Sequence, residues 1–533
     1  MNNQLTIRTI LVCALVAAGL HGAPARADEL SVVTVEPAPR SLQGGPQGHV
    51  TVYFDRPVDR NTVVPGQSFS VFGRWSGTAT GKLFFTGGDT AVTLDPVRRF
   101  SSGEQVRVDL SHDITGADGV PIRPGGYAYQ FWVRAGTAEM DFNEIQRLST
   151  RTTPAAATRA YGGIASDLDR DGFLDLTIVN EVTADLRVFM NRGDLTGTFD
   201  DFLQPPSPVN IQASPSEPAD FNRDGFTDIC VANIATHTVS ILLGQGDGTY
   251  GPQQEIAVGQ NPRGIAVLDV DGDGDIDVVN TNSGSSNMSL LLNDGTGVFG
   301  PATFFEGGGS GEWALAAADM NEDGLLDLVI GARDSQEVVI SLANGDGTFT
   351  LASSRSAGGL VWMLVTGDLN GDGHEDVATA NSTSNNAAIL LGNGNAALGA
   401  PTVYPIDPFS LATDLGDLDG DGDLDWITSS FNGDWRLFRN IGSGTFSPIE
   451  EFIPSATASC ALLLDADNDT DLDLALIDEV DDEIIIMENT GSPGYLPIPA
   501  ASWPGKALGL IALIVLGPRL ARIVKKRTCA DAA

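Results

Sequence analysis

A nine-residue acidic motif recurs seven times in this sequence, and its spacing limits the possible folds more than any other feature. The third copy reads DVDGDGDID, from Asp269 to Asp277. The copies begin at Asp167, Asp220, Asp269, Asp319, Asp368, Asp417 and Asp465, so their separations are 53, 49, 50, 49, 49 and 48 residues. A period of this length is typical of arrays in which each unit is one supersecondary structure packed on its neighbours.

Every period has the same internal plan. One apolar run precedes the acidic loop and a second follows it, as in GIAVLDV and IDVVNTN. A third run ends in a turn, as in SLLLNDGTG, and a weaker fourth follows, as in VFGPATFFE. These runs predict four strands joined by hairpins. The first two are almost continuously apolar, which indicates burial on both faces. Four-stranded sheets arranged around an axis give that environment, so we predict a β-propeller.

The ends of the repeat region test the number of blades. Seven loops predict seven blades, but the last unit meets a Pro/Gly-rich segment before a fourth strand. Residues 140–150, MDFNEIQRLST, are similar to the fourth strands of other units. We therefore predict that residues 142–150 complete the last blade and that the propeller spans 140–490. Such closure removes an exposed sheet edge. A solenoid would need capping repeats, which we do not find in the sequence.

Residues 28–138 do not share the period. Six short strand patterns separated by Gly, Pro and Asp turns predict a small β-sandwich there. The stretches LSVVTVEPAP, VTVYFDRPVDRNTV and VPIRPGGYAYQFWV resemble bacterial Ig-like domains of the surface-layer type. The expected fold class is therefore all-β: a seven-bladed propeller of four-stranded blades, preceded by a small Ig-like sandwich.

Both termini carry targeting patterns. Residues 1–27 have a short apolar run and the small-residue site Ala25-Arg26-Ala27, which predict a cleaved signal peptide rather than an uncleaved anchor. After a Pro/Gly linker at 491–503, residues 504–533 contain an apolar segment and then a basic tail. This pattern predicts either a membrane anchor or a bacterial C-terminal sorting signal. We expect an exported protein, at the cell surface or extracellular, that contacts the membrane through this segment.

The charge of the chain limits its partners. The formal net charge is -40, which argues against nucleic acid because phosphates would be repelled. Cations are the natural partners of such a sequence. With four cysteines in 533 residues, no disulfide framework is visible.

The acidic motif matches the ligand spacing of a calcium loop. Calcium takes 6–8 oxygen ligands, and an EF-hand loop supplies side chains at positions 1, 3 and 5, a carbonyl at position 7, and Gly at position 6 for a sharp turn. In the third copy Asp269, Asp271 and Asp273 occupy positions 1, 3 and 5, with Gly274 at position 6. Asp277, at position 9, can close the shell. A bound divalent ion would neutralise a cluster that otherwise repels itself.

The spacing D-x-[DN]-x-D-G-x-x-D, flanked by strands rather than helices, resembles the FG-GAP/VCBS repeats of integrin α-subunit propellers over residues 140–490. This resemblance implies Ca²⁺, mainly structural, in the loop between the first two strands of each blade, and roles in adhesion and extracellular recognition. The side-chain ligands that it implies are Asp167, Asp169, Asp171 and Asp175; Asp220, Asn222, Asp224 and Asp228; Asp269, Asp271, Asp273 and Asp277; Asp319, Asn321, Asp323 and Asp327; Asp368, Asn370, Asp372 and Asp376; Asp417, Asp419, Asp421 and Asp425; and Asp465, Asp467, Asp469 and Asp473.

One loop departs from the pattern. Thr470 stands where the other six loops have Gly, and a β-branched residue is disfavoured at positive φ. The seventh site is therefore expected to be distorted or weak. The alternative for every loop is a solvated Asp-rich turn without metal.

The opposite face of the propeller is the expected place for a partner. Six residues before each loop stand Tyr161, Ser214, Arg263, Trp313, Trp362, Leu411 and Ser459, which should ring the mouth of the channel. Tyr161, Trp313 and Trp362, with Arg263, are candidates to bind a sugar or a peptide. Alternatively, the aromatic residues plug the channel as packing.

Catalysis has little support in the sequence. His237 is the only histidine expected on this face, and no partner for it is evident. The leading hypothesis is a non-catalytic, calcium-binding recognition or adhesion protein whose partner is an extracellular protein or a glycan. The alternatives are a carbohydrate-active enzyme, such as a polysaccharide lyase that uses Tyr161 and Arg263, and a passive envelope protein.

Overall fold

The computed structural model describes residues 29–45, 48–452 and 457–491. In these ranges the chain forms strands, with one short 3₁₀ turn, η1 (Ser382–Ser384). The described residues belong to one compact unit that ends at Gly494. Within them, no helix has the length and apolar character needed to span a membrane. The predicted signal peptide, residues 492–503 of the linker and the C-terminal segment 504–533 lie outside the described residues.

The N-terminal strands form two four-stranded antiparallel sheets that share one core. The six predicted strands are all present, and β1 and β4 join them. One sheet has the order β1 (Val32–Glu36), β2 (Val50–Phe54), β6 (Ala91–Pro96) and β5 (Gly81–Thr86); the other has the order β4 (Gly77–Thr78), β3 (Phe69–Gly73), β7 (Gln105–Leu110) and β8 (Tyr127–Trp132). Val52, Val92, Val106 and Val108 are fully buried between them. We call residues 30–137 the N-terminal sandwich.

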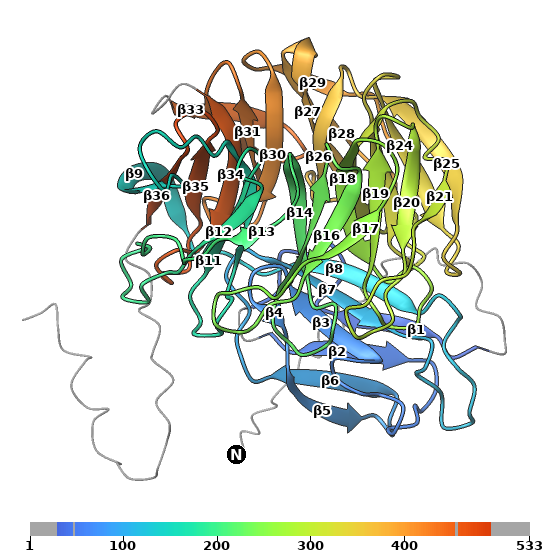
Figure 1. Ribbon diagram of the computed structural model, residues 1–533. Coiled ribbons are helices and arrows are strands. Elements are labelled where there is room, and N and C mark those ends of the chain that lie inside the picture. The colour runs from blue at the N-terminus through green and yellow to red at the C-terminus, as the bar shows by residue number, and fades with distance from the viewer. Residues whose placement is uncertain (1–28, 46–47, 453–456, 492–533) are drawn as a thin grey trace, which may run out of the picture. The chain divides into compact units, whose positions relative to one another are not determined.

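The periodic region forms seven further four-stranded antiparallel sheets (Figure 1). The first three are β10 (Ala160–Ser166), β11 (Asp175–Asn180), β12 (Asp185–Phe189) and β13 (Ser207–Pro208); β14 (Ala213–Ala219), β15 (Asp228–Asn233), β16 (Thr238–Leu242) and β17 (Gln254–Ala257); and β18 (Pro262–Leu268), β19 (Asp277–Asn282), β20 (Asn287–Leu291) and β21 (Thr303–Phe305). The next three are β22 (Glu312–Ala318), β23 (Asp327–Ala332), β24 (Glu337–Ala343) and β25 (Phe349–Ser356); β26 (Val361–Gly367), β27 (Asp376–Asn381), β28 (Asn386–Leu390) and β29 (Thr402–Pro405); and β30 (Ser410–Gly416), β31 (Asp425–Ser430), β32 (Trp435–Asn440) and β33 (Phe446–Phe452). The last is β34 (Ala458–Leu464), β35 (Asp473–Asp478), β36 (Glu483–Gly491) and β9 (Ala138–Ser149).

The last sheet is completed by a strand from before the first repeat, as the sequence predicts. β36 pairs with β9, and Ile484 lies opposite Leu148 in the register. The strand is longer than expected, because it begins at Ala138 rather than near residue 142. The first strands of consecutive sheets contact one another, and that of the last sheet contacts β10, so the repeats form a closed array. Together with the repeated sheets, this arrangement is a repeat β-propeller.

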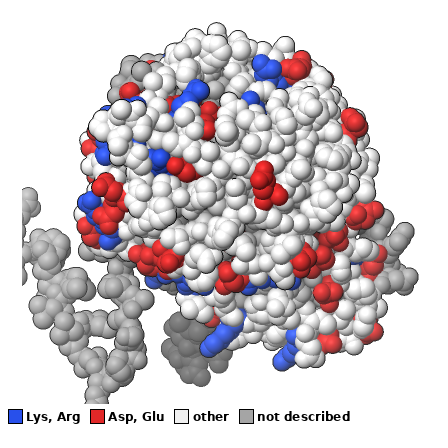
Figure 2. Space-filling model, in the orientation of Figure 1, with Lys and Arg blue, Asp and Glu red and all other residues white. Residues whose placement is uncertain are grey.

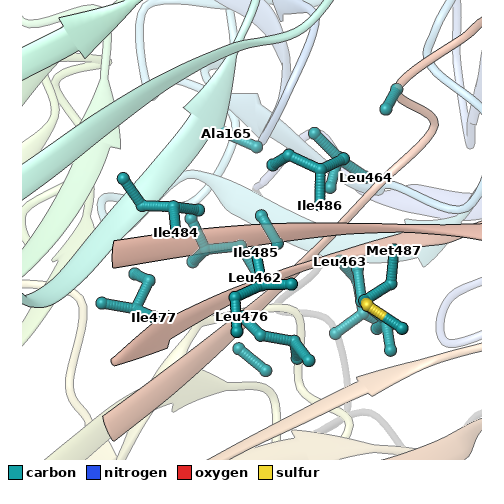
Figure 3. Packing of buried hydrophobic residues seen from close by; sticks show 14 of the residues in the cluster. Ala165, Leu462, Leu463, Leu464, Leu476, Ile477, Ile484, Ile485, Ile486 and Met487 are labelled. Carbon is teal, nitrogen blue, oxygen red and sulfur yellow. The ribbon is translucent and has the colours of Figure 1, made fainter. Parts of the chain in front are cut away.

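Burial follows the apolar runs of the sequence. In every repeat the second strand is buried along its whole length, as in β19 and β35. In the last sheet, Leu476, Ile485 and Ile486 are fully buried and pack in one cluster with Ala165 of the first repeat (Figure 3). This apolar contact between the last and first sheets stabilises the closure.

The first strand of the second repeat contains two prolines, Pro215 and Pro218, which a central strand would not tolerate. The structure places this strand, β14, at the edge of its sheet, where a missing backbone donor costs no ladder hydrogen bond. The same edge position holds for the first strand of each repeat.

A recurring asparagine joins neighbouring sheets. Asn191, Asn293, Asn440 and Asn489 each donate a side-chain hydrogen bond of 2.8–2.9 Å to a carbonyl in the acidic loop of the preceding repeat. In these repeats, a buried polar contact therefore fixes adjacent sheets relative to each other.

Candidate functional site

Each acidic loop connects the first strand of a repeat to the second. Position 1 follows the first strand directly, and position 9 is the first residue of the second strand. In all seven loops the position-1 carboxylate accepts the backbone N–H of position 6, at 2.8–3.2 Å. This bond folds the chain back, so that the side chains at positions 1, 3 and 5 line one small loop.

The position-9 aspartate has a structural role that the sequence did not reveal. One of its oxygens accepts the N–H of position 2, at 2.8–3.1 Å. The other accepts a backbone N–H within two residues of the end of the third strand, at 2.6–2.9 Å. Each carboxylate oxygen has a second lone pair, so these bonds do not preclude a ligand role. Position 9 therefore holds the loop against the sheet whether or not it also binds an ion.

Four loops bring carboxylates together closely enough to hold a metal ion. In each, oxygens of three residues lie within 4.8 Å of one another: Asp167, Asp169 and Asp175; Asp269, Asp271 and Asp273; Asp417, Asp419 and Asp425; and Asp465, Asp467 and Asp473. The other three loops have Asn at position 3, and its amide lies 2.8–3.1 Å from the position-5 carboxylate. Oxygen donors of this kind suit a hard cation such as Ca²⁺.

Buried oxygens in the loops lack partners in the described part of the chain. Asp167, Asp220, Asp417 and Asp465 each have a buried Oδ1 without a hydrogen bond. Burial raises the pKa of the position-9 carboxyls, to about 8 for Asp175, Asp228, Asp327 and Asp425. Unpaired buried carboxylates are unfavourable. The residues therefore fit a bound cation, which would satisfy both the charge and the free oxygens.

The seventh loop is strained at the position that the sequence singled out. Thr470 has φ 90°, in the same left-handed range as the glycines at position 6 of the other loops, such as Gly422 at 98°. Its N–H nevertheless makes the usual bond to Asp465, at 3.1 Å. The loop thus keeps its shape at a conformational cost.

Replacing Thr470 by Gly should stabilise the protein by about 1 kcal/mol, because the left-handed backbone costs an L-residue roughly that much. Urea unfolding, monitored by tryptophan fluorescence, measures the change. The matched control is Gly422→Thr. A Cβ at Gly422 would meet no atom within 4 Å, so only its φ opposes the substitution. It should destabilise by a similar amount, and equal stabilities for Thr470→Gly and the parent would contradict the strain.

The N-terminal sandwich covers the acidic loops, which the sequence did not predict. Every loop forms a hydrogen bond of 2.6–3.2 Å with the sandwich or, in one case, with the first residue of β9. The pairs are Trp75 with Asp167, Thr78 with Asp220, His112 with Gly272, Ala128 with Gly324, Arg40 with Gly373, Ala138 with Asp419 and Gly136 with Thr470. Arg98 also forms an ion pair with Asp167. The sandwich is thus docked on the loop face, and one predicted calcium ligand already has a cationic partner.

At the other end of the first strands, the seven positions predicted to ring the channel all line one cavity of about 220 Å³. Trp313 and Trp362 lie with ring centroids 4.3 Å apart, and the Arg263 guanidinium is 4.1 Å from the Trp313 ring. Trp362 Nε1 donates to the Tyr161 hydroxyl at 3.0 Å. The structure therefore brings the four candidate ligand-binding residues into one cluster. Arg333, which the sequence analysis missed, joins it at 4.9 Å from Trp313.

His237 lies outside this cluster, in the turn between β15 and β16. Its Nδ1 is 3.1 Å from both Ile234 O and Asn261 N, so the ring is held by the backbone of two loops. His237 therefore has a structural role, because its ring connects the two loops.

A family model described as FG-GAP-like repeat matches residues 167–231, 220–280, 269–330, 319–379, 368–428 and 417–476. The chain belongs to this family of repeat β-propellers. The matches begin and end within the acidic motifs and the following strands, so they cover the candidate metal loops of this FG-GAP-like protein. No curated protein matches the chain significantly.

Several solved structures are similar to this FG-GAP-like protein at low identity. BBS1N in complex with ARL6DN has 12% identity and a TM-score of 0.46, and covers 65% of this chain and 96% of its own. A streptogramin B lyase has 11% identity and a TM-score of 0.45, with 67% and 100% covered. A catalytically inactive virginiamycin B lyase from Staphylococcus aureus with quinupristin has 14% identity and a TM-score of 0.42, with 65% and 99% covered.

Proposed function

We propose that this FG-GAP-like protein is an exported, calcium-binding recognition protein of the cell surface, with a non-catalytic β-propeller as its binding scaffold. The seven sheets would be the blades of an integrin-like seven-bladed propeller, and the N-terminal sandwich an Ig-like domain. Support for export and surface attachment comes from the sequence patterns at residues 1–27 and 504–533. Support for calcium comes from the carboxylate clusters and their unpartnered oxygens.

The observation that carries the recognition role is the cluster of Tyr161, Arg263, Trp313 and Trp362 at the channel mouth. These side chains are partly exposed, so their apolar faces are available to a partner. Aromatic residues combined with an arginine are characteristic of binding hot spots. The sandwich covers the other face of the repeats, which leaves this face for an extracellular protein or a glycan.

A polysaccharide lyase is the second candidate, because Tyr161 and Arg263 meet in the same cluster. A lyase needs a group that removes a proton, and a tyrosine serves best when its pKa is low. Burial instead raises the pKa of Tyr161 well above its ordinary value. This shift favours binding over proton abstraction at neutral pH.

The test is a screen of the purified protein against glycan and extracellular-protein arrays in calcium, followed by affinity measurements on variants. The double variant Trp313→Ala, Trp362→Ala should lose at least tenfold in affinity, since contact with each indole ring contributes about 1 kcal/mol or more to the binding free energy. Phe304→Ala is the matched control, because Phe304 is 53% exposed on the outer strand β21. It should bind normally.

The other outcomes separate the alternatives. Unchanged affinity in the double tryptophan variant would remove the channel mouth as the binding site. Depolymerisation of a glycan would identify an enzyme. Neither binding nor turnover across the arrays would indicate a passive envelope protein.

A further inference from the structure

The channel has one closed end. Its wall is made by the first strands of the repeats, and its far end is lined by Arg74, Arg107 and Gln130 of the N-terminal sandwich. Arg107 donates to Val267 O at 2.7 Å, and Arg74 forms an ion pair with Glu217 at 3.3 Å, so the sandwich is bonded to the wall at this end. In the described part of the chain the sandwich covers this end, so a ligand would enter from the mouth at Tyr161 and Trp313.

The mouth offers aromatic faces and hydrogen-bond donors. The Tyr161 hydroxyl accepts from Trp362 and has no acceptor for its own proton in the described part of the chain. Arg263 is partly buried, and its Nε has no hydrogen-bond partner among the described residues. Its guanidinium lies 4.1 Å from the Trp313 ring and 5.8 Å from the Trp362 ring, and the Glu181 carboxylate attracts its charge from beyond ion-pair distance. Such a group is suited to an anionic acceptor that a ligand brings with it.

The interior of the cavity combines an apolar wall with several polar and charged groups. Arg74 and Glu217 neutralise each other, and Asp414 and Gln105 lie in the same lining. Ser216 Oγ is buried without a partner among the described residues. The interior therefore presents both donors and acceptors, as a polyhydroxylated ligand requires. With a volume of about 220 Å³, the cavity takes a small group rather than a long chain.

We infer that this blind channel binds the terminal residue of an acidic glycan: a sugar ring that carries a carboxylate. The ring stacks on Trp313 and Trp362, the carboxylate accepts hydrogen bonds from Arg263 and Tyr161, and the hydroxyl groups face the polar groups of the interior. Because the far end is covered, the protein binds the ends of glycan chains and not their internal sugar units. This inference rests on the proposed recognition function and specifies its ligand.

An acidic peptide fits the channel less well. A peptide binds a sheet by adding a strand along a free edge. Here the free edges of the first strands face one another around the channel, so an added strand would occlude the space that the others need.

The experiment measures binding of a hexuronic acid trisaccharide to the full protein in calcium, by quenching of tryptophan fluorescence and by calorimetry. The comparison probes are the same trisaccharide with its carboxylates reduced to alcohols, a long polymer of the same hexuronic acid, and a peptide that ends in glutamate. The variants are Arg263→Gln and, as a control, Arg355→Gln, since Arg355 lies on the outer strand β25 and bonds only Gly399 O among the described residues. Melting curves check that both variants fold.

The acidic trisaccharide should bind at least tenfold more tightly than the reduced one, and Arg263→Gln, but not Arg355→Gln, should abolish the difference. The polymer should saturate the protein in proportion to its number of chain ends, not its mass. The inference would be overturned if the acidic trisaccharide does not bind, if the reduced probe binds equally well, or if the peptide binds more tightly. It would also be overturned if Arg263→Gln has no effect, or if the polymer saturates the protein in proportion to its mass. The recognition function would survive these results if an array partner still depended on Trp313 and Trp362.

Discussion

Removing calcium should lower the melting temperature of the purified protein by on the order of 10 °C or more. A ligand that binds only the folded state at 100 times its dissociation constant adds roughly 2.7 kcal/mol per site, so two filled loops add about 5 kcal/mol. For a large domain, each 1 kcal/mol shifts the melting temperature by roughly 2–4 °C. The physical cause is the buried carboxylate clusters, such as Asp465, Asp467 and Asp473, which repel one another without a counter-ion.

Differential scanning calorimetry with calcium and with a chelator, at matched ionic strength in sodium, measures this change. Asp273→Asn should remove one site from a calcium titration, because Asp273 belongs to the carboxylate cluster of the third loop and stands at position 5, which is Asp in all seven loops. The matched control is Asp294→Asn. Asp294 lies in a hairpin turn and accepts hydrogen bonds from Thr296 instead. A melting temperature that does not respond to chelator would show that the loops are solvated turns.

Asp482→Asn should destabilise the protein by roughly 3 kcal/mol, since it weakens a buried clasp that closes the array of sheets. Asp482 is fully buried at the end of the turn that precedes β36. Its Oδ1 accepts from Thr158 Oγ1 at 2.8 Å and Arg159 N at 2.6 Å, and its Oδ2 from Arg151 Nε at 2.8 Å and Thr158 N at 3.1 Å. One carboxylate thus ties the last sheet to the segment between β9 and β10.

The pH dependence of this effect identifies the charge as its source. Burial opposes ionisation, but the hydrogen bonds from Arg151 and Thr158 outweigh it and lower the pKa of Asp482. A lowered folded-state pKa stabilises the fold above the unfolded value, near 3.9, and this contribution is lost as the pH falls through the folded value. Urea unfolding should therefore show the full difference at pH 7 and a smaller one below about pH 4. The neighbouring exposed Asp481→Asn is the control; an equal loss in both variants would contradict the clasp.

The repeat pattern of the sequence predicted most of the structural features that recur from sheet to sheet. The continuously apolar runs gave the wholly buried second strands, such as β19 and β35, because burial on both faces leaves no polar alternation. The missing fourth strand in the last unit predicted its replacement by β9, since an open edge would otherwise remain. The register of Tyr161, Arg263, Trp313 and Trp362 relative to the acidic loops predicted one cluster, because equivalent positions in a closed array face the same axis.

Contacts that occur once could not be predicted in this way. The docking of the N-terminal sandwich depends on single groups such as Arg40, Thr78 and Arg98, and no period relates them to the loops that they contact. The blind end of the channel follows from that docking and was missed with it. The asparagines that join neighbouring sheets were not predicted either, although Asn293 and Asn440 both lie within two residues of the end of the third strand.

The acidic side chains are unevenly distributed over the protein. Despite the net charge of -40, broad areas of the visible surface in Figure 2 carry neither acidic nor basic side chains. Many of the carboxylates are concentrated in the loops instead, where strand geometry holds them together. The acidity of the sequence is therefore mainly a property of the candidate metal loops, not of a uniformly charged exterior.

The pairing of β9 with β36 also determines when the protein can finish folding. Arg147 and Glu483, which form an ion pair across this seam, are separated by 336 residues. Closing so long a loop is entropically costly and slow, and it must wait until the last repeat has left the ribosome. Until then β35 and β9 each offer an unpaired edge. A newly made chain therefore passes through an open array that is exposed to aggregation, and a truncated chain never leaves that state.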